Sequence, residues 1–143
     1  MAVLKNILLV VVGFVLGSGV NMALVVAGSA LIPGPPGVDM SDSESIANSI
    51  HLFEVKHFVF PFLAHALGTL FGALAAGYLG WTNRTVLVWS VAVLFFAGGV
   101  ATSFMIPAPA AYIVTDLALA YVPMALLALY VLNTFIRKSD GQV

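Results

Sequence analysis

Four long apolar stretches constrain the fold of this chain more than any other feature. They cover approximately residues 4–32, 53–80, 85–106 and 110–136. Each exceeds the ~20 residues that an α-helix needs to cross a hydrocarbon core, and only helices satisfy every backbone polar group within such a segment. With 62% hydrophobic and 8% charged residues, a soluble domain of this length could not bury its apolar surface. We predict an all-α integral membrane protein, a four-transmembrane-helix bundle that forms one domain over residues 1–143.

A secretory signal peptide is the alternative interpretation of the first stretch. Lys5 precedes the apolar run, and Gly28-Ser29-Ala30 resembles a small-residue cleavage site. The run is nevertheless much longer than the ~7–15 apolar residues of a signal peptide. We therefore interpret it as a membrane helix.

The loop over residues 33–52 is predicted to carry a short helix on the outer side. Its first part is rich in proline and glycine and cannot continue the first span. Ser41 and Glu44 then form the S-x-x-E pattern of a capping box, which predicts a helix that starts near Ser41 and either lies at the surface or extends into the second span. Pro61 and Pro123 should kink the second and fourth spans, and the third span reads as scaffold.

The positions of the basic residues predict the orientation. Lys5, Arg84, Arg137 and Lys138 flank one side of the predicted membrane, and the other side holds only Lys56. By the positive-inside rule both termini are cytoplasmic, in a plasma or inner membrane, and the chain ends in a polar tail over residues 137–143. The net charge of -1 argues against nucleic acid as a partner, and the absence of cysteine excludes disulfides and thiolate chemistry.

All three histidines lie at the start of the second span or within it, and they suggest two polar sites. In the first, His51, Glu54 and His57 follow one another at three-residue spacing, which on a helix places them on successive turns. Imidazole and carboxylate ligands suit zinc, iron, manganese or copper, so these residues are the candidate metal site. Further oxygen ligands are available from a set of acidic residues in the preceding loop: Asp39, Asp42 and Glu44. The alternative interpretation is surface histidines with Glu54 paired to Lys56.

The second candidate site is built around His65, which lies too deep in the span to reach water. A neutral imidazole has one donor and one acceptor to satisfy, and leaving either unpaired in an apolar interior costs about 1–3 kcal/mol. Asp116 is the only acidic residue of the other three spans and Asn21 the amide at similar depth. We predict that at least one of them lies within direct or water-bridged reach of His65, with Thr69 nearby.

A pair of His65 and Asp116 in the bundle core is typical of a proton relay or a coupling-ion site. A buried, hydrogen-bonded pair that only fixes helix packing is an equal alternative. Haem ligation would need two copies of His65 from a symmetric dimer. The inner halves of the spans carry no ionisable group, which weakens transport.

Small residues at four-residue spacing favour close helix contacts. They occur at Gly13/Gly17, Gly68/Gly72 and Ala73/Gly77, more edges than one contact per helix needs, which predicts a homo-oligomer in the lipid bilayer.

The sequence identifies no reaction, so whether the protein is an enzyme is left open. It predicts a small polytopic membrane protein whose polar site, in the outer half of the bundle, binds a divalent metal or handles ions. One alternative is an auxiliary membrane protein whose polar residues only fix packing. The other is an oligomeric, proton-linked transporter or channel for small solutes.

Overall fold

The computed structural model describes residues 2–140, without the side chains of Trp81 and residues 136–140, and it is helical with no strand among these residues. The elements are α1 (Ala2–Leu31), α2 (Ser43–Ser49), the 3₁₀ turn η1 (Ile50–Leu52), α3 (Val55–Leu79), the 3₁₀ turn η2 (Trp81–Asn83), α4 (Arg84–Met105), α5 (Ala110–Leu119) and α6 (Val122–Asp140).

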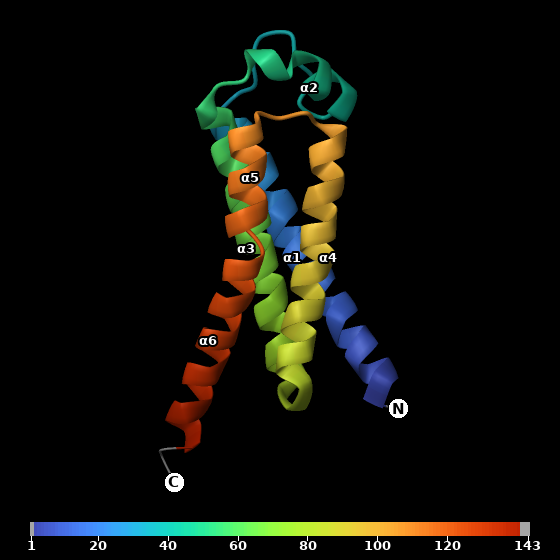
Figure 1. The fold of residues 1–143 in the computed structure, drawn as a ribbon, viewed down its shortest axis with the longest axis vertical. Helices are drawn as coiled ribbons and strands as arrows, with labels where there is room; N and C mark the ends of the chain where they lie inside the picture. The colour runs from blue at the N-terminus through green and yellow to red at the C-terminus, as the bar shows by residue number, and fades with distance from the viewer. Residues whose placement is uncertain (1, 141–143) are drawn as a thin grey trace.

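Four helical segments are long and apolar enough to cross a membrane: Ala2–Leu31, Val55–Leu79, Arg84–Met105 and, across α5 and α6, Ala110–Phe135. They run side by side, and the start of α1 and the end of α6 lie at one end of the bundle while α2 crosses the other (Figure 1). The end with α2 is named the outer end and the opposite one the inner end, as labels for position in the bundle. The predicted four-helix architecture and the short helix between the first two spans are confirmed. The chain is a small integral membrane protein.

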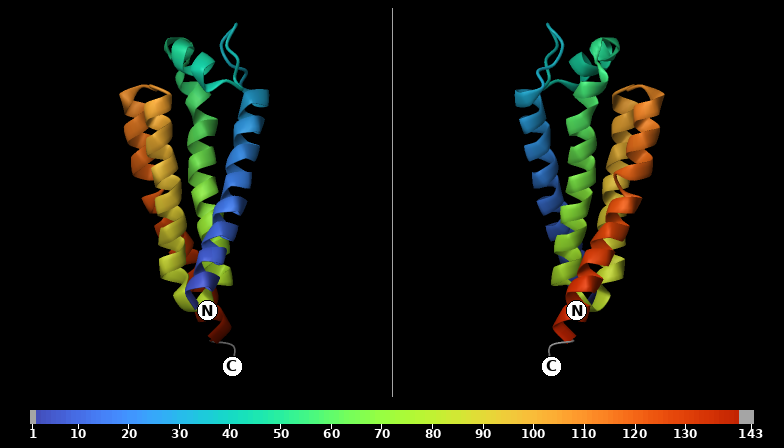
Figure 2. Two further views of the ribbon diagram at one scale, coloured as in Figure 1. Left: turned by 90° about the vertical axis from the view of Figure 1, so that its right-hand side faces the viewer. Right: turned by 90° about the vertical axis from the view of Figure 1, so that its left-hand side faces the viewer.

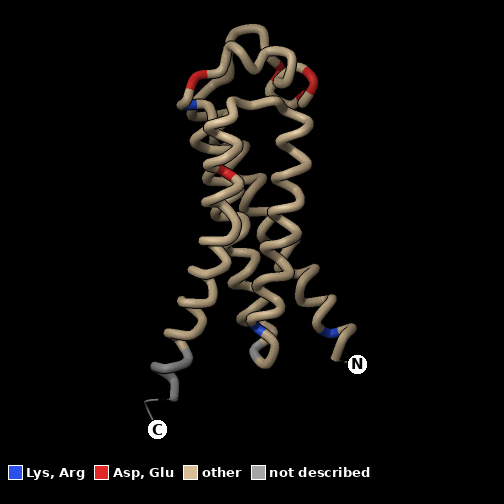
Figure 3. The backbone as a smooth tube through the Cα atoms, viewed as in Figure 1, with Lys and Arg blue, Asp and Glu red and all other residues tan. Residues whose placement is uncertain are grey.

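Charged residues lie mainly at the two ends of the molecule (Figure 3). Apart from one acidic position partway along the bundle, the apolar helices carry none between these ends in the part of the chain that the figure colours. This distribution is the one that a membrane-spanning bundle requires, because a charge in the hydrocarbon layer is costly.

Glycines bring α1 and α3 into backbone contact along their inner halves. A Cβ atom built on Gly72 would lie 2.7 Å from the carbonyl oxygen of Gly13, and one built on Gly68 would lie 3.0 Å from that of Gly17. Gly77 faces α4 and α6 in the same way, since its Cβ would lie 2.8 Å from a methyl of Val88. These small-residue edges are therefore used within one chain. The homo-oligomer predicted from these edges stays a prediction.

The remaining core lies in the inner half, where α3, α4 and α6 meet. Apart from Leu87, its fully buried members there are alanines and valines, which lets the helices approach closely: Ala73, Ala76, Val88, Val91, Ala125 and Ala128. Toward the end that carries α2, α1 and α4 diverge (Figure 2). The inner half is thus closely packed, and the outer half has room for a cavity.

The fourth span is broken rather than kinked. Pro123 lacks a backbone N–H and its ring clashes with the carbonyl four residues earlier, so α5 ends at Leu119 and α6 begins at Val122. The two helices run in different directions (Figure 1). The predicted kink at Pro123 is therefore a short break within a span that still covers Ala110–Phe135. The break leaves Asp116 in the last turn of α5 and Tyr121 between the helices.

The outer segment also differs from its prediction. Asp42, not Ser41, caps α2, because its side chain accepts hydrogen bonds from the backbone N–H groups of Glu44 and Ser45 at 3.0 and 3.3 Å. Phe53 is extended (φ −80°, ψ 134°), and α3 starts after its N-cap residue Glu54. No single helix therefore runs through this region into the second span.

Candidate functional site

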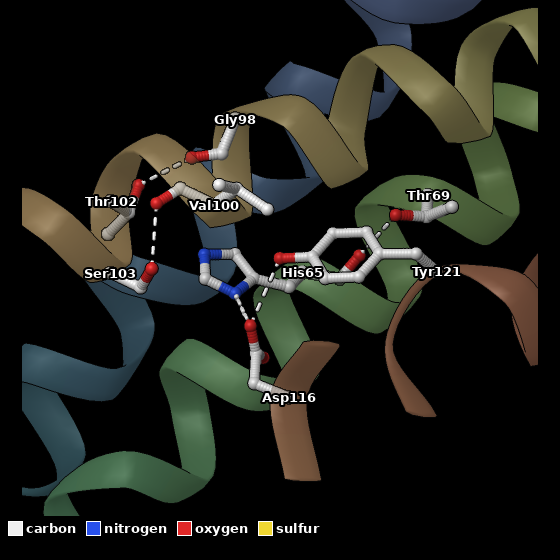
Figure 4. Close-up of polar contacts among 8 residues, drawn as sticks. All are labelled: His65, Thr69, Gly98, Val100, Thr102, Ser103, Asp116 and Tyr121. Carbon is white, nitrogen blue, oxygen red and sulfur yellow. Dashed lines mark hydrogen bonds and ion pairs between the residues drawn. The ribbon is translucent and has the colours of Figure 1, made fainter. Parts of the chain in front are cut away.

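His65 and Asp116 form a direct pair between α3 and α5. The Nδ1 atom of His65 lies 3.0 and 2.9 Å from the two carboxylate oxygens of Asp116, and the Tyr121 hydroxyl donates to Oδ2 at 3.0 Å (Figure 4). Asp116 is 4% exposed and Tyr121 1%. The prediction that His65 has a polar partner in Asp116 is confirmed.

The position of Asp116 explains why it needs two donors. A carboxylate in the last turn of a helix is opposed by the helix dipole, and a buried charge must be paired or hydrogen-bonded. His65 and Tyr121 supply those hydrogen bonds. Tyr121 is held there by Gly99 of α4, because a Cβ atom on Gly99 would overlap the tyrosine hydroxyl.

The sequence analysis did not select Tyr121 or α4 as parts of this site. The available signal was an aromatic residue five positions after the only acidic residue of its span, beside the proline that breaks the helix. The third span, interpreted as scaffold, contributes Gly99 as packing space and several residues to the wall of a cavity.

Two residues predicted at this site lie near it without touching the imidazole. Thr69 is buried, and its hydroxyl donates to the backbone carbonyl of His65 at 2.7 Å. Asn21 lies beside Gly68, whose added Cβ would be 3.1 Å from that of Asn21, and it makes no polar contact with His65 among the described residues. The site is therefore the His65–Asp116–Tyr121 cluster rather than a convergence on Asn21.

A cavity of about 230 Å³ lies between the cluster and the outer end of the bundle. All the outer segments contribute to it, and most of the wall is apolar. Representative wall residues are Ile32 just after α1, Ile46 of α2, Phe58 and Phe60 of α3, Ile106 just after α4 and Leu117 of α5. A cavity of ~150 Å³ accommodates benzene. This one is about half again as large, the size of a single ring with a small substituent.

The second ring nitrogen of His65 faces this cavity. His65 lines the cavity and its side chain is 19% exposed. Among the described residues, every buried side-chain nitrogen or oxygen has a hydrogen-bond partner, whereas Nε2 of His65 has none. Nε2 is therefore not a buried atom. That nitrogen is consequently reachable from the cavity, and Figure 4 shows it on the side of the ring that faces Ser103. Asp116 orients the ring, and Nε2 is the atom it presents.

The three predicted metal ligands do not share a helical face. His51 lies in η1, Glu54 is the N-cap of α3, and His57 is in the first turn of that helix. Glu54 and His57 form a capping box, in which the Nδ1 atom of His57 accepts a hydrogen bond from the Glu54 backbone N–H at 2.9 Å. The helical geometry assumed for these residues was wrong, because the chain is extended at Phe53. Within the described residues no group of three histidine, cysteine, aspartate or glutamate side chains is placed to hold a metal ion.

Two acidic residues of the outer segment, Glu54 and Asp39, are hydrogen-bonded to neighbours in the chain. Lys56 donates to Glu54 at 3.0 Å, and this hydrogen bond lowers the pKa of the Glu54 carboxyl below its usual value. Asp39 accepts from both the hydroxyl and the backbone N–H of Ser41, which lowers its pKa as well. Asp39 and Asp42, which the sequence offered as additional metal ligands, bind Ser41 and cap α2 respectively. Glu54 is paired with Lys56, as in the alternative interpretation.

Comparison of the chain with models of protein families, with curated proteins and with solved structures found no match.

Proposed function

We propose that this membrane protein binds a small, largely apolar molecule with one polar head group, in the cavity at the outer half of its bundle. One observation carries the proposal. A cavity of about 230 Å³ with mainly apolar walls contains a histidine whose orientation is fixed by a buried carboxylate and whose Nε2 atom has no protein partner. Apolar walls with a few oriented polar groups are the usual features of a ligand site.

The packing of the inner half favours binding over passage through the bundle. Below His65, α1 and α3 are in backbone contact at Gly17 and Gly68, and the core around Val88 and Val91 is fully buried. No acidic, basic or histidine side chain of the described residues lies between the site and the end that carries Lys5 and Arg84. A relay for ions would need such groups, whereas a binding site does not.

The distribution of basic residues supports a proposed orientation. Lys5 and Arg84 lie at the end away from the cavity, the acidic loop lies at the cavity end, and Arg137 and Lys138 follow the fourth span in the sequence. By the positive-inside rule both termini would be cytoplasmic, in a plasma or inner membrane, and the cavity would open toward the opposite side.

Binding of p-cresol tests the proposed function, because this compound has a benzene-sized body and one polar head. Titration calorimetry on the full chain in lipid nanodiscs should show saturable binding above the partitioning seen with empty nanodiscs. Ser103→Phe, which fills the cavity from α4, should abolish it. Val93→Phe, at a 60% exposed position on the same helix, is the matched control and should leave binding intact.

Should Ser103→Phe fail to fold, Thr102→Leu fills the same wall with less bulk and keeps the test valid. Helical content and thermal midpoint establish that each variant is folded. Saturable binding that is equal in the wild-type protein and in a folded cavity-filled variant would refute the proposed site.

A further inference from the structure

The serine and threonine hydroxyls of the cavity wall have already used their only hydrogen. Ser29 donates to the carbonyl of Val25 at 3.1 Å, Thr102 to that of Gly98 at 3.0 Å, and Ser103 to that of Val100 at 2.7 Å. A hydroxyl has one hydrogen and two lone pairs. Toward the cavity these three groups therefore present lone pairs only, which accept hydrogen bonds.

His65 presents the same polarity. Its Nδ1 lies at nearly equal distances, 3.0 and 2.9 Å, from both oxygens of Asp116, and Oδ2 also accepts from Tyr121. This geometry assigns the hydrogen to Nδ1, since a carboxylate with two donors around it acts as an acceptor. In a neutral imidazole with the hydrogen on Nδ1, the other nitrogen is an acceptor. Nε2 thus offers a lone pair to the cavity, in line with the hydroxyls of α4.

The donors of the wall lie near the mouth, at the outer ends of α3 and α5. The Nδ1 atom of His57 accepts from the Glu54 backbone, so its second nitrogen carries the hydrogen. Lys56 is at the start of α3 and is already paired with Glu54. Tyr112 is in the first turn of α5, one turn closer to the mouth than Asp116. The mouth therefore carries these donors together with the acceptor hydroxyls near the ends of α1 and α4, whereas the deep group that His65 presents at the floor is an acceptor.

We propose that the ligand is an uncharged hydrogen-bond donor, a small phenol, alcohol or amine whose O–H or N–H is bound by Nε2 of His65. This inference names the head group for the proposed function and depends on it. An ether of the same shape leaves the acceptor at the floor unpaired. A carboxylate meets lone pairs there and lies close to the negative charge of Asp116, so both analogues are disfavoured.

Four compounds with the same methylphenyl body test the proposal by titration calorimetry in nanodiscs. p-Cresol and p-toluidine carry a donor, 4-methylanisole carries none, and p-toluate carries a negative charge. We expect both donors to bind at least about tenfold more tightly than either of the other two, and tenfold corresponds to about 1.4 kcal/mol at 25 °C.

The double variant His65→Leu/Asp116→Leu assigns this preference to the pair. It replaces both partners by apolar groups, which avoids an orphaned buried charge, and it should bind p-cresol and 4-methylanisole about equally. Ser103→Ala, which removes one wall acceptor but leaves the imidazole, is the matched control and should keep the preference. If the double variant does not fold, His65→Gln on its own offers an amide in place of the imidazole and should reduce the preference for donors.

The outcomes separate this inference from the proposed function. Equal binding of all four compounds to the wild-type protein, abolished by Ser103→Phe, would overturn the donor proposal and leave the binding function standing. A donor preference that persists in the double variant would overturn the role of His65. Absence of saturable binding by every compound would overturn both.

Discussion

A methyl group added at Gly99 is expected to destabilise the protein, whereas the same change one residue earlier is not. A Cβ atom at position 99 would overlap the hydroxyl of Tyr121 and lie 2.6 Å from its Cζ, so the whole edge of the ring would have to move. Tyr121 is 1% exposed, so its ring is enclosed by its neighbours. At Gly98 an added Cβ meets no atom within 4 Å.

The size of the effect follows from three contributions. Overpacking a buried position costs about 1–3 kcal/mol. Displacing Tyr121 weakens its hydrogen bond to the Asp116 carboxylate, and such bonds contribute about 1.5–3 kcal/mol. Alanine gains up to ~1 kcal/mol over glycine in helix propensity. The net destabilisation by Gly99→Ala is therefore roughly 2–4 kcal/mol, whereas Gly98→Ala should be neutral or stabilising by up to ~1 kcal/mol.

Reversible unfolding in mixed micelles with increasing dodecyl sulfate, followed by the loss of helical signal, measures both variants on one scale. The comparison is matched, because the two substitutions are the same and adjacent. Equal free energies of unfolding for Gly99→Ala and Gly98→Ala would refute the position assigned to Tyr121, and with it the buried cluster at the floor of the cavity.

Three further substitutions test other parts of the structure. Tyr121→Phe removes one donor from a buried carboxylate and should cost about 1.5–3 kcal/mol, whereas Tyr130→Phe, at a 68% exposed position, should change stability little. Gly17→Ala places a methyl against the backbone of α3 and should destabilise by about 1–3 kcal/mol, while Gly19→Ala, with no neighbour within 4 Å, should not; equal stabilities would argue against the backbone contact. Glu54 has a pKa below the ordinary carboxyl value of 4.5 in the folded protein, so its stabilisation is present above that pH and is lost as the pH falls through the lowered value. Glu54→Ala should therefore lower the thermal midpoint at pH 6 and have less effect at pH 3, and a difference independent of pH would contradict the pairing of Glu54 with Lys56.

The four spans and the His65–Asp116 pair could be predicted from the sequence because each depends on composition. Apolar length determines which segments cross a membrane, and a buried histidine must find a partner. With Asp116 the only acidic residue in the other three spans, few partners were available. The outcome of Pro123 was harder to predict, since a proline in a helix either kinks or breaks it. That choice determines where Tyr121 lies.

The metal site was predicted from an arrangement that tertiary structure overrides, and the homo-oligomer stays a prediction. Spacing of three residues predicts a shared face only on a continuous helix, and the extended backbone at Phe53 removes that condition. Likewise, glycine edges indicate close packing without naming the partner. Gly13 and Gly72 turn out to face each other within the chain.

The protonation of the His65 ring tests the central claim most directly. Nitrogen-15 NMR of histidine-labelled protein in bilayers, at mildly alkaline pH and with His65→Gln to assign the signal, distinguishes which ring nitrogen carries the hydrogen. The structure predicts a hydrogen on Nδ1, bonded to Asp116, and a bare Nε2 whose resonance shifts when p-cresol is added and does not shift with 4-methylanisole. A hydrogen on Nε2 with a bare Nδ1, or an Nε2 resonance that p-cresol leaves unchanged at saturating concentration, would contradict the account.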